Sequence, residues 1–223
     1  MRWVLCSVSE PAFVATLTEL APDAVIHLAG LQIPTCRDNP VLGAHVNLVG
    51  TLNVFEAAKA RKAAGHAPFS IVYASSAAIF GPDEDYHREA VNDSSAPMPA
   101  SHYGAFKLCC EHSARAYFTA NGISSVGLRP LSVYGPGRDA GLTSFPSRSI
   151  AAAVRGEPFE IPFSGPTCYT HVREVRRLAV RARMCVARRV WRVRRRRPPP
   201  PPPPPHSFAW PRELPVHSLK ARA

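Results

Sequence analysis

Long apolar runs, paired cysteines and metal-ligand spacings are all missing from this 223-residue sequence. No stretch is both long and apolar enough to cross a bilayer, and the short start at residues 1–6 meets polar residues too soon for a secretory signal. The six cysteines form no C-x-x-C pair and the nine histidines are scattered, so we expect no disulfide framework and no metal site. Reduced cysteines are typical of a cytoplasmic protein, which is the location we expect.

Acidic residues are scarce only toward the carboxyl end. Residues 176–223 hold 14 Lys or Arg and one acid, which leaves +13, whereas residues 1–175 hold the other 13 Lys or Arg and 15 acids, which leaves −2. Residues 198–205 are all proline, and such a run forms a stiff extended segment without a packed core. We therefore expect a domain at residues 1–175, followed by a disordered Arg/Pro-rich tail at residues 176–223.

Short apolar segments alternate with segments of helical spacing through the first 175 residues. We expect strands at 3–8, 23–30, 69–76 and 124–129, helices at 12–20, 41–64, 103–120 and 144–156, and one or two short strands between 158 and 175. The alternation of strands with helices indicates an α/β fold with a parallel, doubly wound sheet.

Tyr103 and Lys107 are four residues apart, so they share one face of the expected helix. An ammonium beside a phenol favours the phenolate, which lowers the phenol pKa and allows a tyrosine to act as a general base near neutral pH. Such a pair can also be an ordinary pair on a helix surface, so its neighbours decide its role. In a parallel sheet, ligands bind beyond the carboxyl ends of the strands. The residues expected at those ends are Gly30, Ser75, Ser76 and Pro130.

Five motifs occur in order at a typical spacing. They are His27-Leu28-Ala29-Gly30, Asn47-Leu48-Val49-Gly50-Thr51, Ser75-Ser76-Ala77-Ala78-Ile79-Phe80-Gly81, Tyr103-x-x-x-Lys107 and Leu128-Arg129-Pro130-Leu131-Ser132-Val133-Tyr134-Gly135-Pro136-Gly137. Together they resemble the NAD-dependent epimerase/dehydratase family, a branch of the extended short-chain dehydrogenases/reductases that includes UDP-glucose 4-epimerase. The resemblance covers roughly residues 1–175, and it implies a Rossmann-like sheet, NAD as the cofactor and a nucleotide sugar as the substrate.

The resemblance also implies a role for each matched residue. Tyr103 would be the base that removes a sugar hydroxyl proton, Lys107 would lower its pKa and hold the nicotinamide ribose, and Ser76 would hydrogen-bond the reacting hydroxyl. The residues implied to line or brace the cofactor site are Leu28, Ala29, Gly30, Asn47, Ala74, Ser75, Tyr103, Lys107 and Pro130. The cofactor would carry the redox step, while the protein would supply orientation and electrostatics.

Some of these residues have plainer interpretations. Asn47 can be a helix residue with a solvent or capping bond, and the two serines can be an ordinary turn at a strand end. His27 is expected to be a packed core histidine rather than a catalytic one.

Two parts of the family pattern have no counterpart in the sequence. No glycine precedes Gly30, so the glycine-rich turn that holds the pyrophosphate is missing, as is the acidic residue that binds the adenosine ribose. The likeness begins at the family's third strand and stops near residue 175. We therefore expect a member truncated at both ends, with a sheet that lacks its first two strands, an apolar edge strand, and weakened or lost NAD binding.

The function implied by the resemblance is transient hydride transfer on a nucleotide sugar, most nearly of the 4-epimerase type, and truncation leaves the activity of this chain open. The alternative is a non-catalytic fragment, or a binding protein whose Arg/Pro-rich tail contacts nucleic acid or an acidic partner. No nucleic-acid-binding fold supports a nucleic-acid partner, and no membrane partner is expected. The expected partners are a nucleotide sugar and a second copy of the chain, joined through the helices at 41–64 and 103–120.

Overall fold

The computed structural model describes residues 3–87, 90–141, 143–162 and 168–187. Every residue that the structure describes belongs to one compact unit, residues 1–191. Most of the expected disordered tail, residues 188–223, lies outside the described residues.

Three parallel strands form the main sheet in the order β1-β2-β3. They are β1 (Ala24–His27), β2 (Ser70–Ala74) and β3 (Ser125–Leu128). In the register, Ala24 pairs with Ser70 and Ile71 pairs with Ser125. The expected α/β fold with a parallel sheet is confirmed, and within the described residues β1 pairs only with β2, so it forms an edge of this sheet.

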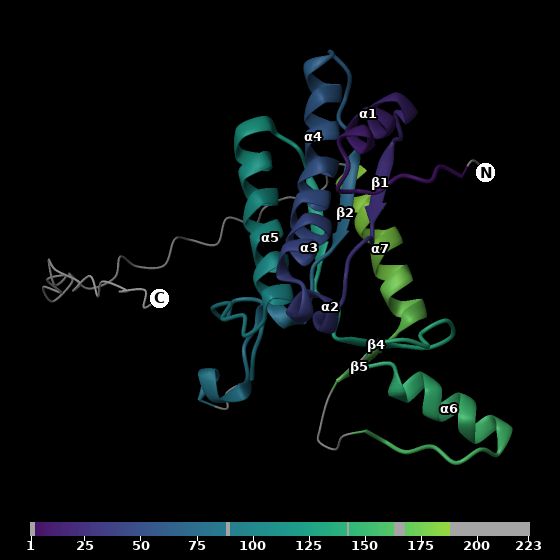
Figure 1. Cartoon of the computed structure of the whole chain (residues 1–223). Helices are drawn as coiled ribbons and strands as arrows, with labels where there is room; N and C mark the ends of the chain where they lie inside the picture. The colour runs from purple at the N-terminus through teal and green to yellow at the C-terminus, as the bar shows by residue number, and fades with distance from the viewer. Residues whose placement is uncertain (1–2, 88–89, 142, 163–167, 188–223) are drawn as a thin grey trace, which may run out of the picture. The chain divides into compact units, whose positions relative to one another are not determined.

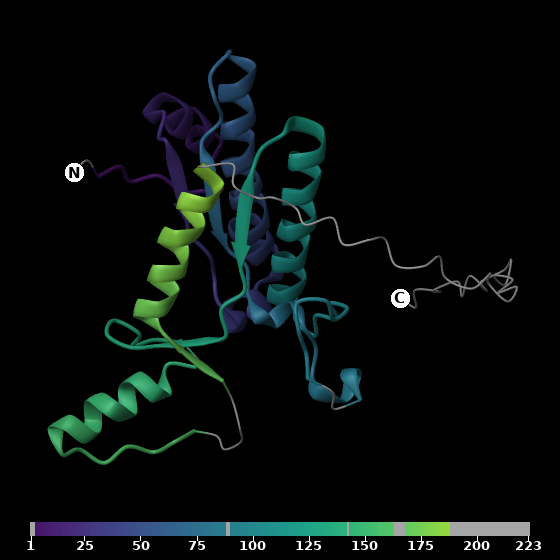
Figure 2. The same cartoon turned by 180° about the vertical axis from the view of Figure 1, so that it is seen from behind.

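Helices cover both faces of the sheet (Figures 1 and 2). On one side lie α1 (Pro11–Leu20), α4 (Gly50–Ala63) and α5 (His102–Asn121), and on the other lies α7 (Val172–Ala187). The core is a cluster of side chains from β2, α4 and α5, against which α1 packs. Within it, the rings of Phe55 and Tyr117 stack with centroids 4.9 Å apart.

The helix expected at 41–64 forms as a continuous run with an irregular turn. It consists of α3 (Pro40–Ala44), a π-helical turn (His45–Val49) and α4, and the short α2 (Ile33–Asp38) precedes it. A π-turn of this kind inserts one residue into a helix and is frequent at functional sites. The turn contains Asn47, whose side chain is fully buried.

The prediction of a strand at residues 3–8 is wrong. Residues 3–7 have no regular structure, and a turn follows. Trp3 is 84% exposed, while Val8 packs on α4, where its carbonyl accepts a hydrogen bond from Asn53 Nδ2 at 2.8 Å. An apolar segment becomes a strand only when a neighbouring strand satisfies its backbone, and no described strand pairs with this one.

Beyond β3 the chain builds a small second sheet from two parallel strands, β4 (Ser132–Tyr134) and β5 (Tyr169–His171). Between them lies α6 (Phe145–Arg155), close to the helix expected at 144–156. Helix α7 then begins at Val172 and continues across residue 175 to Ala187, so residues 176–187 of the expected disordered tail are helical. The domain limit expected at residue 175 remains a prediction. None of the described helices has the length and apolar character needed to span a membrane.

Candidate active site

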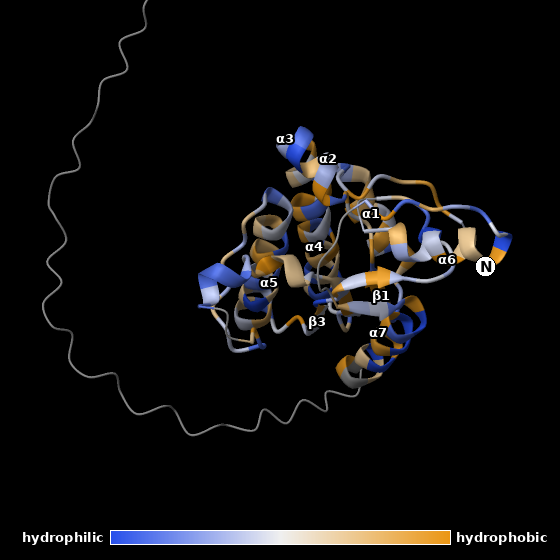
Figure 3. Ribbon diagram, turned by 90° about the horizontal axis from the view of Figure 1, so that it is seen from below, coloured by the Kyte–Doolittle hydropathy of each residue, from blue (hydrophilic) through white to orange (hydrophobic). Residues whose placement is uncertain are grey.

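The three strands of the main sheet end at a common rim, because all three are parallel. Figure 3 looks toward this rim from below. The residues that follow β1 there (Leu28, Ala29 and Gly30) are exposed, whereas those that follow β2 (Ser75 and Ser76) are buried or half-buried. The predicted strand-end residues are therefore brought to one edge of the sheet.

Helix α5 delivers Tyr103 to this rim through its first turn. Ser101 caps the helix, since its hydroxyl accepts a hydrogen bond from the Gly104 amide at 3.1 Å. A Cβ on Gly104 would lie 2.0 Å from the carbonyl oxygen of Ala78, so the helix touches the turn at Ala77–Ile79 backbone to backbone. Only glycine permits this approach, which sets Tyr103 beside the serine that precedes the turn.

Ser76 lies close enough to Tyr103 for its side chain to lower the pKa of the phenol. The Ser76 hydroxyl accepts a hydrogen bond from the Ala78 amide at 3.1 Å, which fixes its direction. The structure thus brings together the serine and the tyrosine that the sequence predicts.

The pKa of Tyr103 is raised above its ordinary value, contrary to the lowering expected from Lys107. Burial of the phenol is the main cause, and the side chain of Ser76 and the charge of Arg138 only partly oppose it. The Lys107 ammonium lies 5.5 Å from the centre of the tyrosine ring. In this chain without a ligand, the desolvation of the Tyr103 phenolate therefore raises the pKa by more than the nearby positive charge lowers it.

Lys107 lies beneath the rim and is only 4% exposed. Its ammonium donates to the carbonyl oxygen of Ala74, the last residue of β2, at 2.7 Å. Burial lowers the pKa of Lys107. The ammonium has three hydrogens, and among the described residues the Ala74 carbonyl is its one hydrogen-bond acceptor.

Asn47 ties the loop after β1 to the π-turn. Its side-chain oxygen accepts from the Leu31 amide at 2.6 Å, and its side-chain nitrogen donates to the Leu31 carbonyl at 3.0 Å. A Cβ on Gly30 would lie 3.0 Å from that same oxygen and 3.6 Å from the Lys107 ammonium. The simple interpretation of Asn47 as a solvent-facing or capping residue is therefore wrong.

His27 is the packed core histidine that the sequence predicts. The Thr51 hydroxyl donates to the Asn47 carbonyl at 2.7 Å, so its oxygen accepts from His27 Nε2 at 3.1 Å, which assigns the proton to that nitrogen. Burial, together with the charge of Lys107, lowers the pKa of His27 to about 4. A neutral histidine thus lies behind the site.

The remaining predicted residues are placed as follows. Ser75 is buried and donates to the Glu111 carboxylate at 2.5 Å, so its hydroxyl is already engaged. Pro130, after β3, is half-buried, and its carbonyl accepts from the Ala77 amide at 3.1 Å. Contact of these residues with a cofactor remains a prediction.

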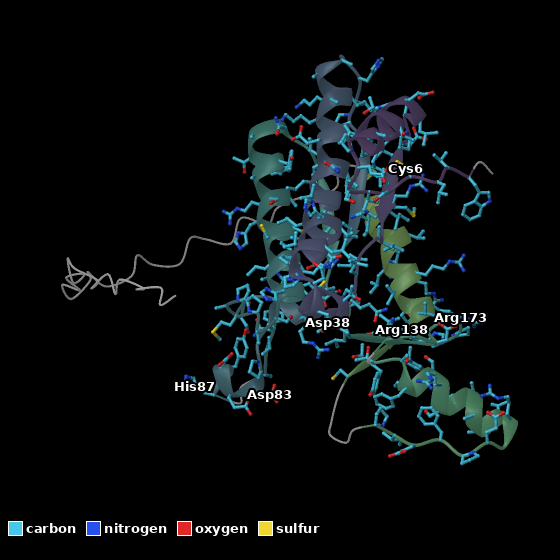
Figure 4. All side chains as sticks on the ribbon, viewed as in Figure 1. Cys6, Asp38, Asp83, His87, Arg138 and Arg173 are labelled. Carbon is cyan, nitrogen blue, oxygen red and sulfur yellow. The ribbon has the colours of Figure 1, made fainter. Side chains whose placement is uncertain are left out.

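Two residues near the site, Glu111 and Arg138, were not predicted from the sequence. Glu111 lies one turn beyond Lys107 on α5, a spacing that could have pointed to it. Arg138 follows β4 and is labelled in Figure 4. Its Nε is buried and has no hydrogen-bond partner among the described residues, while its Nη2 donates to the Thr143 hydroxyl at 3.2 Å.

A pocket of about 360 Å³ lies where Arg138, Ser147 and His171 meet, between the second sheet and α6. Its surface is largely apolar, and Tyr134 and Ile150 form part of it. A pocket with apolar walls and a few polar groups is the usual form of a small-molecule site.

Comparison with known proteins matches residues 2–183 to the NAD dependent epimerase/dehydratase family. GDP-6-deoxy-D-mannose reductase of Pseudomonas aeruginosa is 31% identical over 153 residues, which are 66% of this chain and 47% of that protein. A probable UDP-glucuronate 4-epimerase of Rhizobium meliloti is 31% identical over 162 residues, 71% of this chain and 44% of that protein. The chain thus spans about half the length of these relatives.

Solved structures show the same fold. UDP-glucose 4-epimerase of Thermus thermophilus, in complex with NAD, has a TM-score of 0.66 at 24% identity, covering 81% of this chain and 58% of that one. A nucleoside-diphosphate-sugar epimerase of Agrobacterium tumefaciens has a TM-score of 0.71 at 23% identity, covering 80% of this chain and 53% of that one. The parallel sheet, the clustered serine, tyrosine and lysine, and the match over residues 2–183 lead to one conclusion: the chain belongs to the NAD-dependent epimerase/dehydratase family.

Proposed function

We propose that the rim of the main sheet is the site of transient oxidation of a nucleotide sugar, of the 4-epimerase type, with NAD as the cofactor. The observation that carries this proposal is the joint placement of Ser76, Tyr103 and Lys107 at the carboxyl ends of the strands. The names of the relatives, which are nucleotide-sugar epimerases and a reductase, support the substrate class.

The residues at the rim fit the nicotinamide end of NAD. The Lys107 ammonium has hydrogens to spare for ribose hydroxyls, and the absence of a side chain on Gly30 leaves the approach to that ammonium open. Leu28 and Ala29 are exposed and would line the same side of the cofactor. When bound, the nicotinamide would accept a hydride from the sugar carbon and return it.

The proton of the same reaction would pass to Tyr103. As the sugar carbon loses its hydride, the hydroxyl oxygen would lose its proton to the phenolate of Tyr103, and a carbonyl would form. The raised pKa of Tyr103 makes this phenolate a minor form at neutral pH in the chain alone. Ser76 would hold the sugar oxygen in line with Tyr103. Tyr103 would then give the proton back to the oxygen as the carbonyl is reduced again.

Epimerase or reductase chemistry suits this site better than dehydration. A dehydratase needs an additional acid to remove water from the sugar. Ala77 and Ala78 follow the serine and His102 precedes the tyrosine, so no carboxylate stands beside either residue in the sequence. This supports the 4-epimerase type of reaction.

A turnover assay tests the proposal. The purified chain is incubated with NAD and, in turn, UDP-glucose, UDP-galactose and UDP-glucuronate, and the epimers are measured by proton NMR. We expect slow epimerisation of one of them that is lost in Tyr103→Phe and kept in Tyr86→Phe, a tyrosine on a surface turn. Equal conversion by both variants would exclude Tyr103 as the base.

NAD is expected to bind this chain weakly, since no glycine precedes Gly30 to form a pyrophosphate-binding turn. Calorimetry with NAD measures the affinity directly. We expect a Kd weaker than micromolar, and a micromolar or tighter Kd would show that other residues hold the pyrophosphate.

Association of two copies through α4 and α5 also remains a proposal. Phe118 on α5 is 58% exposed, which leaves an apolar side chain available on this pair of helices. Light scattering on the wild type and on Phe118→Glu tests it, because a dimer formed through these helices should dissociate in the variant.

A further inference from the structure

The Ser75 hydroxyl donates its hydrogen bond to Glu111, away from Tyr103. Ser75 is 1% exposed, and its Oγ donates to Glu111 Oε1 at 2.5 Å. Ser76, the next residue, carries the hydroxyl that meets Tyr103. The two serines at the end of β2 therefore have separate tasks, and what holds the first one limits where the second can lie.

Glu111 is held rigidly by Arg129. The guanidinium donates twice, from Nε to Oε1 at 2.8 Å and from Nη2 to Oε2 at 2.6 Å. Such paired bonds fix the orientation of a carboxylate as well as its position. Burial alone would raise the pKa of Glu111, yet the hydrogen bonds from Arg129 and Ser75 lower it, so Ser75 donates to an ionised acceptor at neutral pH.

A second connection lies on the other side of Ser76. The Ala77 amide donates to the carbonyl oxygen of Pro130 at 3.1 Å, and Pro130 directly follows Arg129. Ser76 is thus flanked by two residues that are both fastened to the end of β3, one through Glu111 and Arg129 and the other through the backbone.

From this arrangement we propose that Glu111 is a positioning residue. By holding Ser75, Glu111 orients the neighbouring Ser76 toward Tyr103. Helix α5 then supplies three groups at intervals of four residues: Tyr103, Lys107 and Glu111. The effect on catalysis rests on the proposed function, but the positioning of Ser76 does not, because it can be measured without turnover.

The titration of Tyr103 reports the position of Ser76. The Ser76 side chain lowers the phenol pKa, so a displacement of Ser76 away from Tyr103 should raise that pKa. Tyrosine labelled with carbon-13 at the ring carbon that bears the hydroxyl gives one NMR signal per residue, and Tyr103→Phe assigns the signal. Circular dichroism at each pH confirms that the chain stays folded.

Ser75→Ala is the decisive variant, because it removes the bond to Glu111 but leaves the pair of Glu111 and Arg129 in place. We expect it to raise the Tyr103 pKa, as should Glu111→Gln. The double variant should shift the pKa no more than the larger single one, since both act through one bond. Glu56→Gln is the matched control, because its carboxylate accepts from Tyr117 at 2.6 Å near the far end of α5.

An unchanged Tyr103 titration in Ser75→Ala would overturn the proposal and leave Glu111 as a brace of the fold alone. A shift in Glu56→Gln as large as in Ser75→Ala would also overturn it, because general loosening of the helices would then be the cause. If Glu111→Gln does not fold, Ser75→Ala alone decides. Failure of the turnover assay would leave this result intact.

Discussion

Burial decides the protonation of the residues that lie beneath the rim. Lys107, His27 and Tyr103 all have pKa values shifted toward their neutral forms, and desolvation is the largest cause in each case. The sequence predicted that Tyr103 and Lys107 share a helix face, which depends only on spacing. It could not predict the direction of the Tyr103 shift, because that depends on how deeply the packed chain covers the phenol.

His27 should make the stability of the domain depend on pH. Its pKa falls from 6.5 in the unfolded chain to about 4 in the folded one, so the unfolded state binds the proton first as the pH drops. Stability is therefore full above pH 6.5 and falls as the pH approaches 4. Between pH 7 and 4.5 we expect the free energy of unfolding to decrease by about 2 to 3 kcal/mol.

Urea unfolding at several pH values measures this loss. In His27→Gln, which keeps a hydrogen-bond donor for Thr51, the decrease over the same range should largely vanish. His66→Gln serves as the control, since His66 is exposed and its replacement should leave the wild-type dependence in place. A variant at position 27 with the full wild-type slope would mean that another group titrates.

Arg138 should influence Tyr103 through its charge. Because the guanidinium lowers the Tyr103 pKa, Arg138→Met should raise it further. The NMR titration of the labelled ring measures the shift. Arg148→Met is the matched control: this arginine stacks over Phe159, with its guanidinium carbon 5.6 Å from the ring centre, and it is not among the groups that shift Tyr103. Equal titrations of the wild type and Arg138→Met would contradict the coupling.

At the scale of elements, the site depends on how closely α5 approaches the turn after β2. Helix α5 and strands β2 and β3 could be predicted from apolar spacing, and the Tyr103-x-x-x-Lys107 motif placed Tyr103 at the start of the helix. The close contact between Gly104 and Ala78 could not be predicted, because a glycine in a helical sequence does not indicate which segment packs against it. The strand expected at 3–8 failed for a related reason: an apolar segment does not reveal whether a partner strand lies beside it.

Gly104→Ala should separate α5 from the turn. The new methyl group would lie 2.0 Å from the Ala78 carbonyl oxygen, so the backbone must move, and we expect a loss of about 1 to 3 kcal/mol in the free energy of unfolding. Urea unfolding measures the loss. Ala105→Ser, at the next and exposed position, should change stability by less than about 0.5 kcal/mol. Wild-type stability in Gly104→Ala would show that the helix can shift without cost.

At the scale of the whole molecule, the residues that the resemblance assigns to the nicotinamide end of NAD gather at one rim of the sheet. The order of strands and the residues at the rim follow from the sequence, because consecutive strands in an α/β fold lie side by side with their carboxyl ends together. The bonds that join Asn47 to Leu31, and Glu111 to Arg129, do not follow from it, since each links segments far apart in the chain. The chain spans about half of the relatives it matches, so its activity has to be measured on the chain itself.

We propose that the rim binds the nicotinamide end of NAD through Lys107. Saturation-transfer difference NMR detects weak binding and shows which protons of a ligand contact the protein. We predict signals from the nicotinamide ring and its ribose with the wild type and with Lys59→Met, a surface lysine on α4, and their loss with Lys107→Met. Signals confined to adenine, or nicotinamide signals that persist unchanged in Lys107→Met, would contradict the claim.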